Sequence, residues 1–353
     1  METISTRRGM TALAATAVAL SMVATGVVAA PAAHAADKLP VSPLWAPLPA
    51  KYASSHRSYL RPGCKWNKFG RGLQLCKVYS PAMGKRIPVE ILPSITPHNP
   101  KVVLALDGYG TRNDHSGFIA NGNLQKHLVR RNVTLVAPIS GDYAAGSYYT
   151  DYESPSGGKN YKWETFLTRE LPSYLARNFQ VPRRKHSTAL VGLSMGSVGI
   201  MNLAQRHPHK YSAVNAMSGY YTLSSPIEST AMRIGARAVG MDPKTLWGQW
   251  PGGKWRDHDP SLNIDSYTMP VRVSCGNGTS MNGSEDLPEF EVIAERASNY
   301  QTKKFQRRVN RSQNSKRFTF RIAEKGAHNW AFWSDDLYRK GGLRFLLRSL
   351  GLR

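Results

Sequence analysis

Two hydrophobic patterns alternate along most of the chain. Short apolar runs at residues 102–106, 133–138 and 187–191 predict buried strands. Residues 163–179 and 196–206 have the spacing of helices with one apolar face. Strands that alternate with helices indicate an α/β fold with a mostly parallel sheet and helices on both faces, the architecture of α/β-hydrolases. Because no repeat or long linker interrupts the pattern, we expect one domain.

Other segments extend this prediction on both sides. Residues 76–93 have the pattern of a hairpin with its turn at 81–85. Residues 220–267 are predicted to form an irregular insertion that carries Trp247, Trp250 and Trp255. The remaining predicted elements are strands at 211–217, 270–274 and 317–322, and helices at 124–131, 287–305 and 335–347.

The first 35 residues have the pattern of a secretory signal peptide. Arg7 and Arg8 form a basic start, residues 10–30 are apolar and small, and residues 33–35 form an A-x-A cleavage site. We therefore expect the mature domain to comprise residues 36–353 and to be exported to the cell envelope. An uncleaved membrane anchor is the alternative, and the cleavage site that follows the apolar run directly argues against it.

Composition and charge narrow the functional classes. Hydrophobic residues make up 41% of the chain, enough to build a core, which excludes a mostly disordered protein. The formal net charge is +24, which suggests an anionic environment. Export makes nucleic acid an unexpected partner and favours a membrane or wall surface. The densest basic stretch, residues 303–321, is predicted to be either a solvated helix face or an envelope-binding surface.

The chain has three cysteines. In an oxidising compartment we expect a disulfide between Cys64 and Cys76, which flank a short loop. Cys275 is then unpaired and follows a predicted strand, so we expect a buried, inert thiol.

The strongest chemical signal is the G-x-S-x-G sequence from Gly192 to Gly196. It directly follows an apolar strand and directly precedes a helix, which is the setting of the nucleophile in α/β-hydrolases. Ser194 is therefore the candidate nucleophile. The oxyanion of such a reaction needs two backbone donors, for which we expect the N–H of Met195 and one from the loop at residues 107–109.

A serine nucleophile needs a base, and this fold orders its groups as Ser, acid, His. His328 lies after the last predicted strand, where the base is expected, and His258 is its main rival. The acid should lie between Ser194 and His328. Spacing alone leaves four candidates open: Asp286, Glu289, Glu291 and Glu295.

From residue 104 to the C-terminus the chain resembles the antigen 85-type mycolyltransferases, within the esterase D-like α/β-hydrolases, and among these a corynebacterial-type member. The resemblance rests on residues 161–168 (YKWETFLT), which are the most specific segment. It also rests on the segments LDG at 106–108, GLSM at 192–195, LWG at 246–248, HDP at 258–260, CGNGT at 275–279 and HNW at 328–330.

The resemblance implies a role for each residue of the site. Ser194 resembles the nucleophile, His328 the base and Glu295 the acid, while His258 becomes structural. Tyr109 and Met195 resemble the oxyanion donors. Residues that resemble the substrate-binding groups are Asp107, Arg112, Asn329 and Trp330. The family often has Arg at the position of Gly110 and Gln at that of Arg112, so the sugar-binding region departs from the pattern.

The implied reaction transfers a mycolyl group from trehalose monomycolate, through a mycolyl-serine intermediate, to a hydroxyl acceptor. The acceptor would be trehalose monomycolate, cell-wall arabinogalactan or a protein serine, and no cofactor or metal is required. We expect a monomer. A plain secreted carboxylesterase uses the same triad and is the first alternative. A non-catalytic wall-binding protein is the second, and the intact set of Ser194, Glu295 and His328 argues against it.

Overall fold

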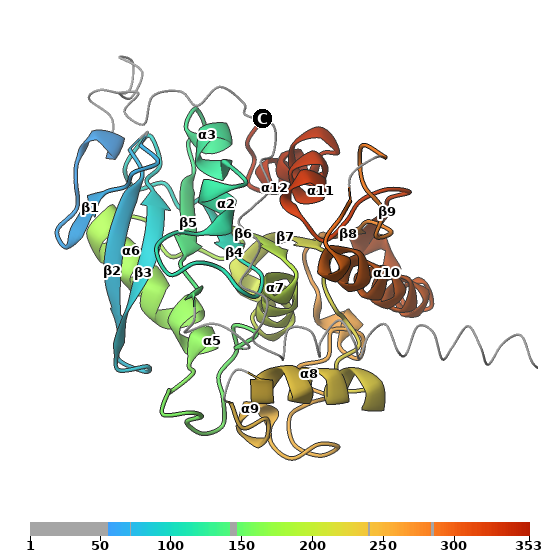
Figure 1. Cartoon of the computed structure of the whole chain (residues 1–353). Helices are drawn as coiled ribbons and strands as arrows, with labels where there is room; N and C mark the ends of the chain where they lie inside the picture. Colours follow the sequence, from blue (N-terminus) through green and yellow to red (C-terminus); the bar gives the residue numbers. More distant parts are fainter. Residues whose placement is uncertain (1–55, 71, 142–146, 239–240, 284–285) are drawn as a thin grey trace, which may run out of the picture.

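The computed structural model describes residues 56–70, 72–141, 147–238, 241–283 and 286–353. The predicted signal peptide lies outside these residues. The described chain is built around one nine-stranded sheet with the strand order β1-β2-β3-β5-β4-β6-β7-β8-β9 (Figure 1). The strands are β1 (Cys64–Trp66), β2 (Gln74–Ser80), β3 (Lys85–Leu92), β4 (Val102–Leu106), β5 (Thr134–Pro138), β6 (Thr188–Leu193), β7 (Tyr211–Met217), β8 (Val271–Cys275) and β9 (Phe318–Ile322).

The strands from β5 to β9 pair in parallel, while β1, β2, β3 and β5 pair antiparallel. The predicted mostly parallel α/β sheet is therefore confirmed. The carboxyl ends of neighbouring parallel strands meet at one edge of the sheet, which is where this class of fold gathers its functional groups.

Helices cover both faces of the sheet, and β4 explains why. All five of its residues are buried, because successive side chains point to opposite faces and both faces are covered. Val102 and Leu104 join one hydrophobic cluster, together with residues of α6 and α7. Val103 and Ala105 join the other, together with residues of α3 and α12. The helices named here are α3 (Leu124–Leu128), α6 (Leu171–Phe179), α7 (Met195–Arg206) and α12 (Gly342–Ser349).

Several predicted helices differ in detail from the observed ones. The predicted helix at 163–179 consists of α5 (Trp163–Thr165), a π-helical segment Phe166–Glu170 and α6. The last helix, predicted at 335–347, is divided into a π-helical segment Asp335–Arg339 and α12, and it is preceded by α11 (Trp330–Ser334). The division falls at Gly341, whose φ of +89° interrupts the helix. The helix predicted at 287–305 is α10 (Glu289–Asn310), five residues longer at its C-terminus than expected.

The description of residues 220–267 as irregular was wrong in part. This segment contains the helix α8 (Pro226–Ala238) and the short helix α9 (Lys244–Trp247). Its tryptophans are not equivalent, since Trp247 and Trp255 are fully buried while Trp250 is partly buried. Trp247 stacks on His258 with 4.5 Å between ring centroids, and both Trp247 and Trp255 belong to the hydrophobic cluster that contains Leu104 of β4.

The structure contains the disulfide between Cys64 and Cys76. The two residues face each other across the β1–β2 pair at the edge of the sheet. The segment between them is therefore a small antiparallel hairpin, whereas the sequence predicted only a loop. Cys275 is a free, buried thiol at the end of β8, and burial raises its pKa to about 12, which keeps it unreactive.

Candidate active site

Ser194 lies at the sharp turn between β6 and α7, with φ +52° and ψ −122°. A non-glycine residue rarely adopts positive φ, and such strain concentrates at functional sites. A Cβ on Gly192 would lie 2.6 Å from the carbonyl oxygen of Gly196, and a Cβ on Gly196 would lie 2.0 Å from that of Leu106. Both glycines are therefore required by packing, and the turn exposes Ser194 at the end of the sheet.

The loop after β4 lies directly beside this turn. A Cβ on Gly108 would be 3.1 Å from Cβ of Ser194, so the backbone of this loop approaches the serine closely because no side chain intervenes. Tyr109 follows Gly108, and Met195 is the first residue of α7. The first N–H groups of a helix have no partner within the helix. The two predicted oxyanion donors thus flank Ser194.

The carboxylate of Glu295 contacts His328. Nδ1 of His328 lies 2.8 Å from Oε2 of Glu295, and Glu295 is fully buried. The other acids that the sequence left open behave differently. Asp286 and Glu289 are exposed, and Glu291 accepts a 2.7 Å hydrogen bond from the amide of Asn329. Glu295 is therefore the acid that can orient the imidazole of His328 and stabilise its charged form.

Two donors hold the second oxygen of Glu295. Oε1 accepts hydrogen bonds from the hydroxyl of Ser218, at 2.8 Å, and from the backbone N–H of Gly276, at 2.5 Å. Ser218 also accepts a 2.9 Å hydrogen bond from the indole of Trp333. Sequence reasoning missed Ser218 and Gly276. A serine and a glycine after strands are common, and nothing in the sequence reveals that both face Glu295.

A chain of contacts joins the serine to the acid–base pair. The N–H of Ser194 donates to the carbonyl of Met217 at 2.9 Å, and the next residue is Ser218. Around His328, the rings of Trp333 and Phe290 meet the imidazole edge-on, at 5.1 and 6.1 Å between centroids. This packing limits the orientations that the imidazole can adopt. The candidate nucleophile thus lies at the turn after β6, the acid on α10 after β8, and the base in the loop after β9.

Asp107, predicted to bind the sugar, contacts backbone groups of the protein itself. Its side chain is fully buried, and its two oxygens accept hydrogen bonds of 3.1 and 3.2 Å from the N–H groups of Gly117 and Phe118. These residues begin the short helix α2 (Gly117–Ala120), which the sequence did not predict. Burial raises the pKa of Asp107 to about 6. Asp107 ties the loop after β4 to α2 and offers no exposed oxygen to a sugar.

The other predicted substrate-binding residues also have protein partners. Arg112 is exposed and forms a 3.0 Å ion pair with Asp114. Asn329 caps α11, because its side-chain oxygen accepts from the N–H of Phe332. Trp330 is half-buried and meets the ring of Phe118 edge-on at 5.4 Å. Of these side chains, Arg112 is the one that extends into solvent.

The rival histidines lie in structural positions. His258 is buried, its Nδ1 lies 3.2 Å from the side-chain oxygen of Asn202, and burial lowers its pKa to about 3. His207, at the end of α7, is partly buried, and its Nε2 lies 2.7 Å from Oε1 of Glu164. His258 is thus held neutral inside the insertion, with no carboxylate as hydrogen-bond partner.

Within the described ranges, no group of three or more His, Cys, Asp or Glu side chains is arranged to hold a metal ion. In the same part of the chain, no helix combines the length and the apolar character that crossing a bilayer requires.

Comparison with known proteins places the chain in a family. The Esterase family model, described as "Putative esterase", matches residues 80–342. The chain is 30% identical to the "Diacylglycerol acyltransferase/mycolyltransferase Ag85A" of Mycobacterium leprae, covering 78% of this chain and 83% of the relative. It is 31% identical to the Ag85B protein of the same description from Mycobacterium avium, covering 81% and 84%.

Solved structures agree with this placement. The crystal structure of Mycobacterium tuberculosis MPT51 (FbpC1) matches with a TM-score of 0.64 and 26% identity, covering 76% of this chain and 96% of that one. An S-formylglutathione hydrolase from Agrobacterium tumefaciens has a TM-score of 0.57 at 17% identity, covering 83% and 100%, and shares the fold alone. The residues that the family model matches, 80–342, include Ser194, Glu295 and His328. The chain belongs to the Esterase family and, within it, to the antigen 85-type mycolyltransferases.

Proposed function

We propose that this protein is an exported serine acyltransferase that moves a mycolyl group from trehalose monomycolate to a hydroxyl acceptor. The observation that carries the proposal is the pairing of a strained serine turn with a buried Glu295–His328 contact of 2.8 Å. The relatives that are named mycolyltransferases support the choice of acyl group. The signal-peptide pattern and the charge of +24 support action at an anionic cell envelope.

The reaction would proceed in two steps. His328 takes the proton of Ser194 as the serine oxygen attacks the ester carbonyl, and Glu295 stabilises the imidazolium that forms. The N–H groups of Tyr109 and Met195 would bind the oxyanion, each worth about 3–4 kcal/mol of the barrier. The tetrahedral adduct then collapses, trehalose leaves with the proton from His328, and a mycolyl ester remains on Ser194.

In the second step His328 removes the proton of the acceptor hydroxyl, which attacks the mycolyl ester and releases Ser194. The acceptor would be a second trehalose monomycolate, which gives trehalose dimycolate, or cell-wall arabinogalactan. A protein serine is the alternative acceptor. Transfer requires that the acceptor displace water at the intermediate, because water would release free mycolate.

The test is to incubate the mature protein with trehalose monomycolate and to follow trehalose, trehalose dimycolate and free mycolate by mass spectrometry. Ser194→Ala is the matched control. We expect dimycolate with little free mycolate from the native protein and neither product from the variant. Free mycolate alone, in the presence of each acceptor class, would indicate a carboxylesterase. Turnover by Ser194→Ala would contradict the proposed nucleophile.

A further inference from the structure

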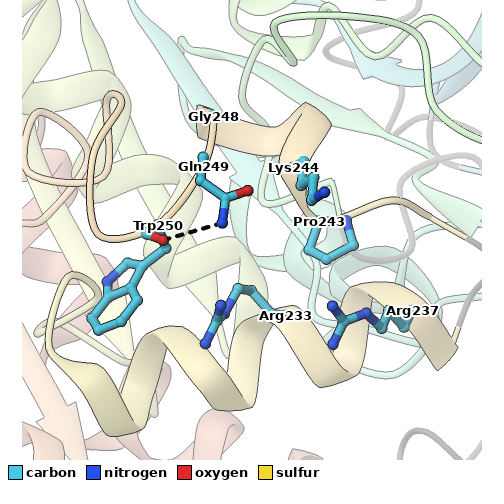
Figure 2. A pocket seen from close by; sticks show the side chains of 7 residues that line it. All are labelled: Arg233, Arg237, Pro243, Lys244, Gly248, Gln249 and Trp250. Atoms are coloured by element: carbon cyan, nitrogen blue, oxygen red, sulfur yellow. Dashed lines mark hydrogen bonds between the residues drawn. The ribbon is translucent and has the colours of Figure 1, made fainter.

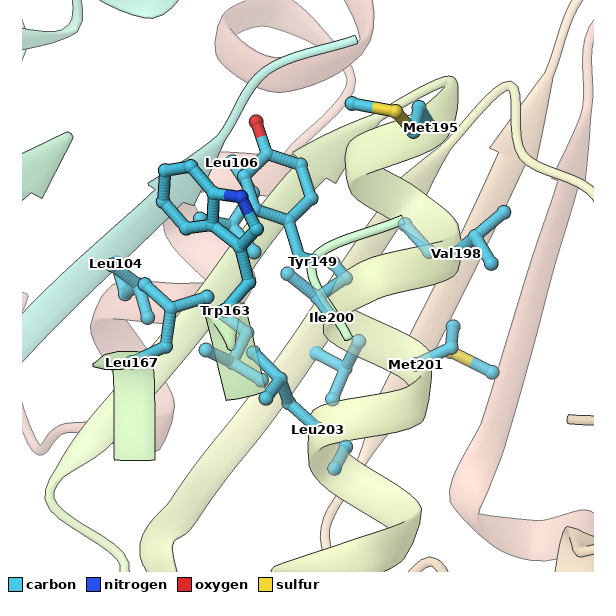
Figure 3. Close-up of a cluster of buried hydrophobic side chains, with 14 of the residues drawn as sticks. Leu104, Leu106, Tyr149, Trp163, Leu167, Met195, Val198, Ile200, Met201 and Leu203 are labelled. Atoms are coloured by element: carbon cyan, nitrogen blue, oxygen red, sulfur yellow. The ribbon is translucent and has the colours of Figure 1, made fainter. Parts of the chain in front are cut away.

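A small hollow lies between α8 and the segment that follows it. Its volume is about 270 Å³, solvent at its mouth included, and its lining residues are Arg233, Arg237, Pro243, Lys244, Gly248, Gln249 and Trp250. In Figure 2, Arg233 and Arg237 lie on α8, below the segment that carries Pro243 and Lys244. None of the candidate catalytic residues lines this hollow.

The hollow gathers three cationic side chains. Arg233 and Arg237 are four residues apart on α8, so they lie one turn apart on the same face. Lys244, at the first position of α9, faces them across the hollow (Figure 2). Like charges at this helical spacing repel each other. Their grouping therefore favours a compensating anion.

No acidic side chain of the described chain supplies that compensation. Among the ion pairs of the described residues, none includes Arg233, Arg237 or Lys244. Two acids lie close in sequence. Glu228 on α8 is buried and pairs with Lys304 at 3.0 Å, while Asp242 accepts a hydrogen bond from the backbone N–H of Lys244.

One of the two guanidinium groups is held in place. The guanidinium carbon of Arg233 lies 5.2 Å from the ring centroid of Trp250, and Arg233 donates to the hydroxyl of Thr230 at 3.0 Å. The indole of Trp250 is itself fixed by a 3.3 Å hydrogen bond to the carbonyl of Ser224. A fixed Arg beside an exposed Arg and an exposed Lys forms a partly preorganised cationic site with donors left for a ligand.

We propose that this hollow binds a phosphate group. Two guanidinium groups and one ammonium supply positive charge and several N–H donors, which match a phosphate group because its oxygens accept several hydrogen bonds. The planar fork of arginine fits phosphate oxygens in a bidentate manner. The phosphate could belong to a lipid headgroup or be free in solution.

The experiment measures binding of inorganic phosphate by calorimetry, and binding to vesicles of phosphatidylcholine with and without phosphatidylglycerol by sedimentation. The variant is Arg233→Gln with Arg237→Gln. The matched control is Arg307→Gln with Arg311→Gln, which removes the same charge from exposed positions four residues apart at the C-terminal end of α10, where Arg311 is the C-cap. A third protein, Arg233→Lys with Arg237→Lys, keeps the charge and loses the bidentate fork. Circular dichroism verifies the fold of each.

The α8 double Gln variant is expected to weaken binding about tenfold or more, the Lys variant less, and the α10 control less than about twofold. If the α8 double Gln variant loses binding only to the vesicles that contain phosphatidylglycerol, the ligand is a lipid headgroup. If the same variant also loses binding to inorganic phosphate, the phosphate group itself is the ligand. Equal weakening by the α8 and α10 Gln variants would overturn the proposal, because diffuse charge would then account for binding. Absence of binding by the native protein to both probes would also overturn it.

Discussion

The hydroxyl of Ser218 donates a 2.8 Å hydrogen bond to Oε1 of Glu295, the carboxylate oxygen that faces away from His328. Ser218 has a φ of +51° and accepts from the indole of Trp333. A carboxylate held at one oxygen by Ser218 and Gly276 can present the other to the imidazole in one orientation. The acid of the site is thus positioned by groups that themselves never reach a substrate.

Removal of this hydroxyl should therefore slow catalysis. We expect Ser218→Ala to lower kcat/KM for a soluble ester about tenfold or more, because a hydrogen bond to a charged group contributes about 1.5–3 kcal/mol. Ser224→Ala is a control, since Ser224 bonds Asp259 within the insertion. Steady-state kinetics with a chromogenic ester measure both. Equal activity of Ser218→Ala and the native protein would show that Gly276 alone holds Glu295.

Replacement of the acid itself should have a larger effect. Glu295→Gln keeps the shape of the side chain and removes the charge that stabilises the imidazolium, so kcat should fall by about 10³–10⁴. Glu291→Gln, one turn earlier on α10, is the matched control, because its side chain contacts Asn329 and not the imidazole. The control should keep activity within about threefold of native. A comparable loss in both variants would contradict the assignment of Glu295.

The glycines of the serine turn should tolerate no side chain. Gly196→Ala places a Cβ 2.0 Å from the carbonyl oxygen of Leu106, and overpacking of this kind costs about 1–3 kcal/mol or more. We expect a lower melting temperature and loss of activity. At Gly252 the nearest atom would lie 3.4 Å away, so Gly252→Ala should be close to neutral. A Gly196→Ala protein as stable and active as the native one would contradict the geometry of the turn.

A buried acid next to the loop after β4 should make stability depend on pH. Glu90 accepts hydrogen bonds from Asn67 and Ser116, and burial raises its pKa from 4.5 to about 7. The folded protein therefore holds this proton more tightly than the unfolded chain does. The resulting stabilisation is present below about pH 4.5 and is lost as the pH rises to about 7, by at most about 3 kcal/mol. Burial also raises the pKa of Asp107, from 3.8 to about 6, so its contribution to stability is likewise lost as the pH rises, over a lower pH range.

Denaturant unfolding at several pH values between 4.5 and 7.5 tests this dependence. The free energy of unfolding of Glu90→Gln, compared with that of the native protein, should fall less steeply as the pH rises, because the variant has no proton to lose at this position. Glu324→Gln, at an exposed position, serves as the control and should keep the native slope. Identical slopes in all three proteins would contradict the raised pKa of Glu90.

Much of this architecture could be predicted from the sequence because its signals are local. Strands such as β4 are uninterrupted apolar runs, and the turn at Ser194 requires glycines on both sides. Shorter elements lacked such signals. The strand β1 has three residues and α2 has four, too few to display a period of two or of 3.6. The segment that contains α8 was predicted to be irregular, although its buried Ala231, Met232 and Ala236 lie on one helical face.

The residues of the site also divide into those that a local sequence signal predicts and those that it does not. Ser194 and His328 follow from a turn motif and from chain order, whereas Glu295 needed the family resemblance because four acids fit the spacing. The contacts of Asp107 with the first N–H groups of α2 could not be predicted, because that helix is too short to show a period. The role of Ser218 depends on where β7 and α10 meet, and no pattern of neighbouring residues encodes that meeting.

The central claim is that Ser194 forms the acyl-enzyme with His328 as its base. The most direct measurement is intact-mass analysis after brief incubation with a serine-directed fluorophosphonate, for the native protein, Ser194→Ala and His328→Gln. We predict one adduct on the native protein, mapped to Ser194 by peptide mass analysis, no adduct on Ser194→Ala, and labelling of His328→Gln slowed at least about a hundredfold. An adduct on Ser194→Ala, or an unchanged rate in His328→Gln, would contradict the account.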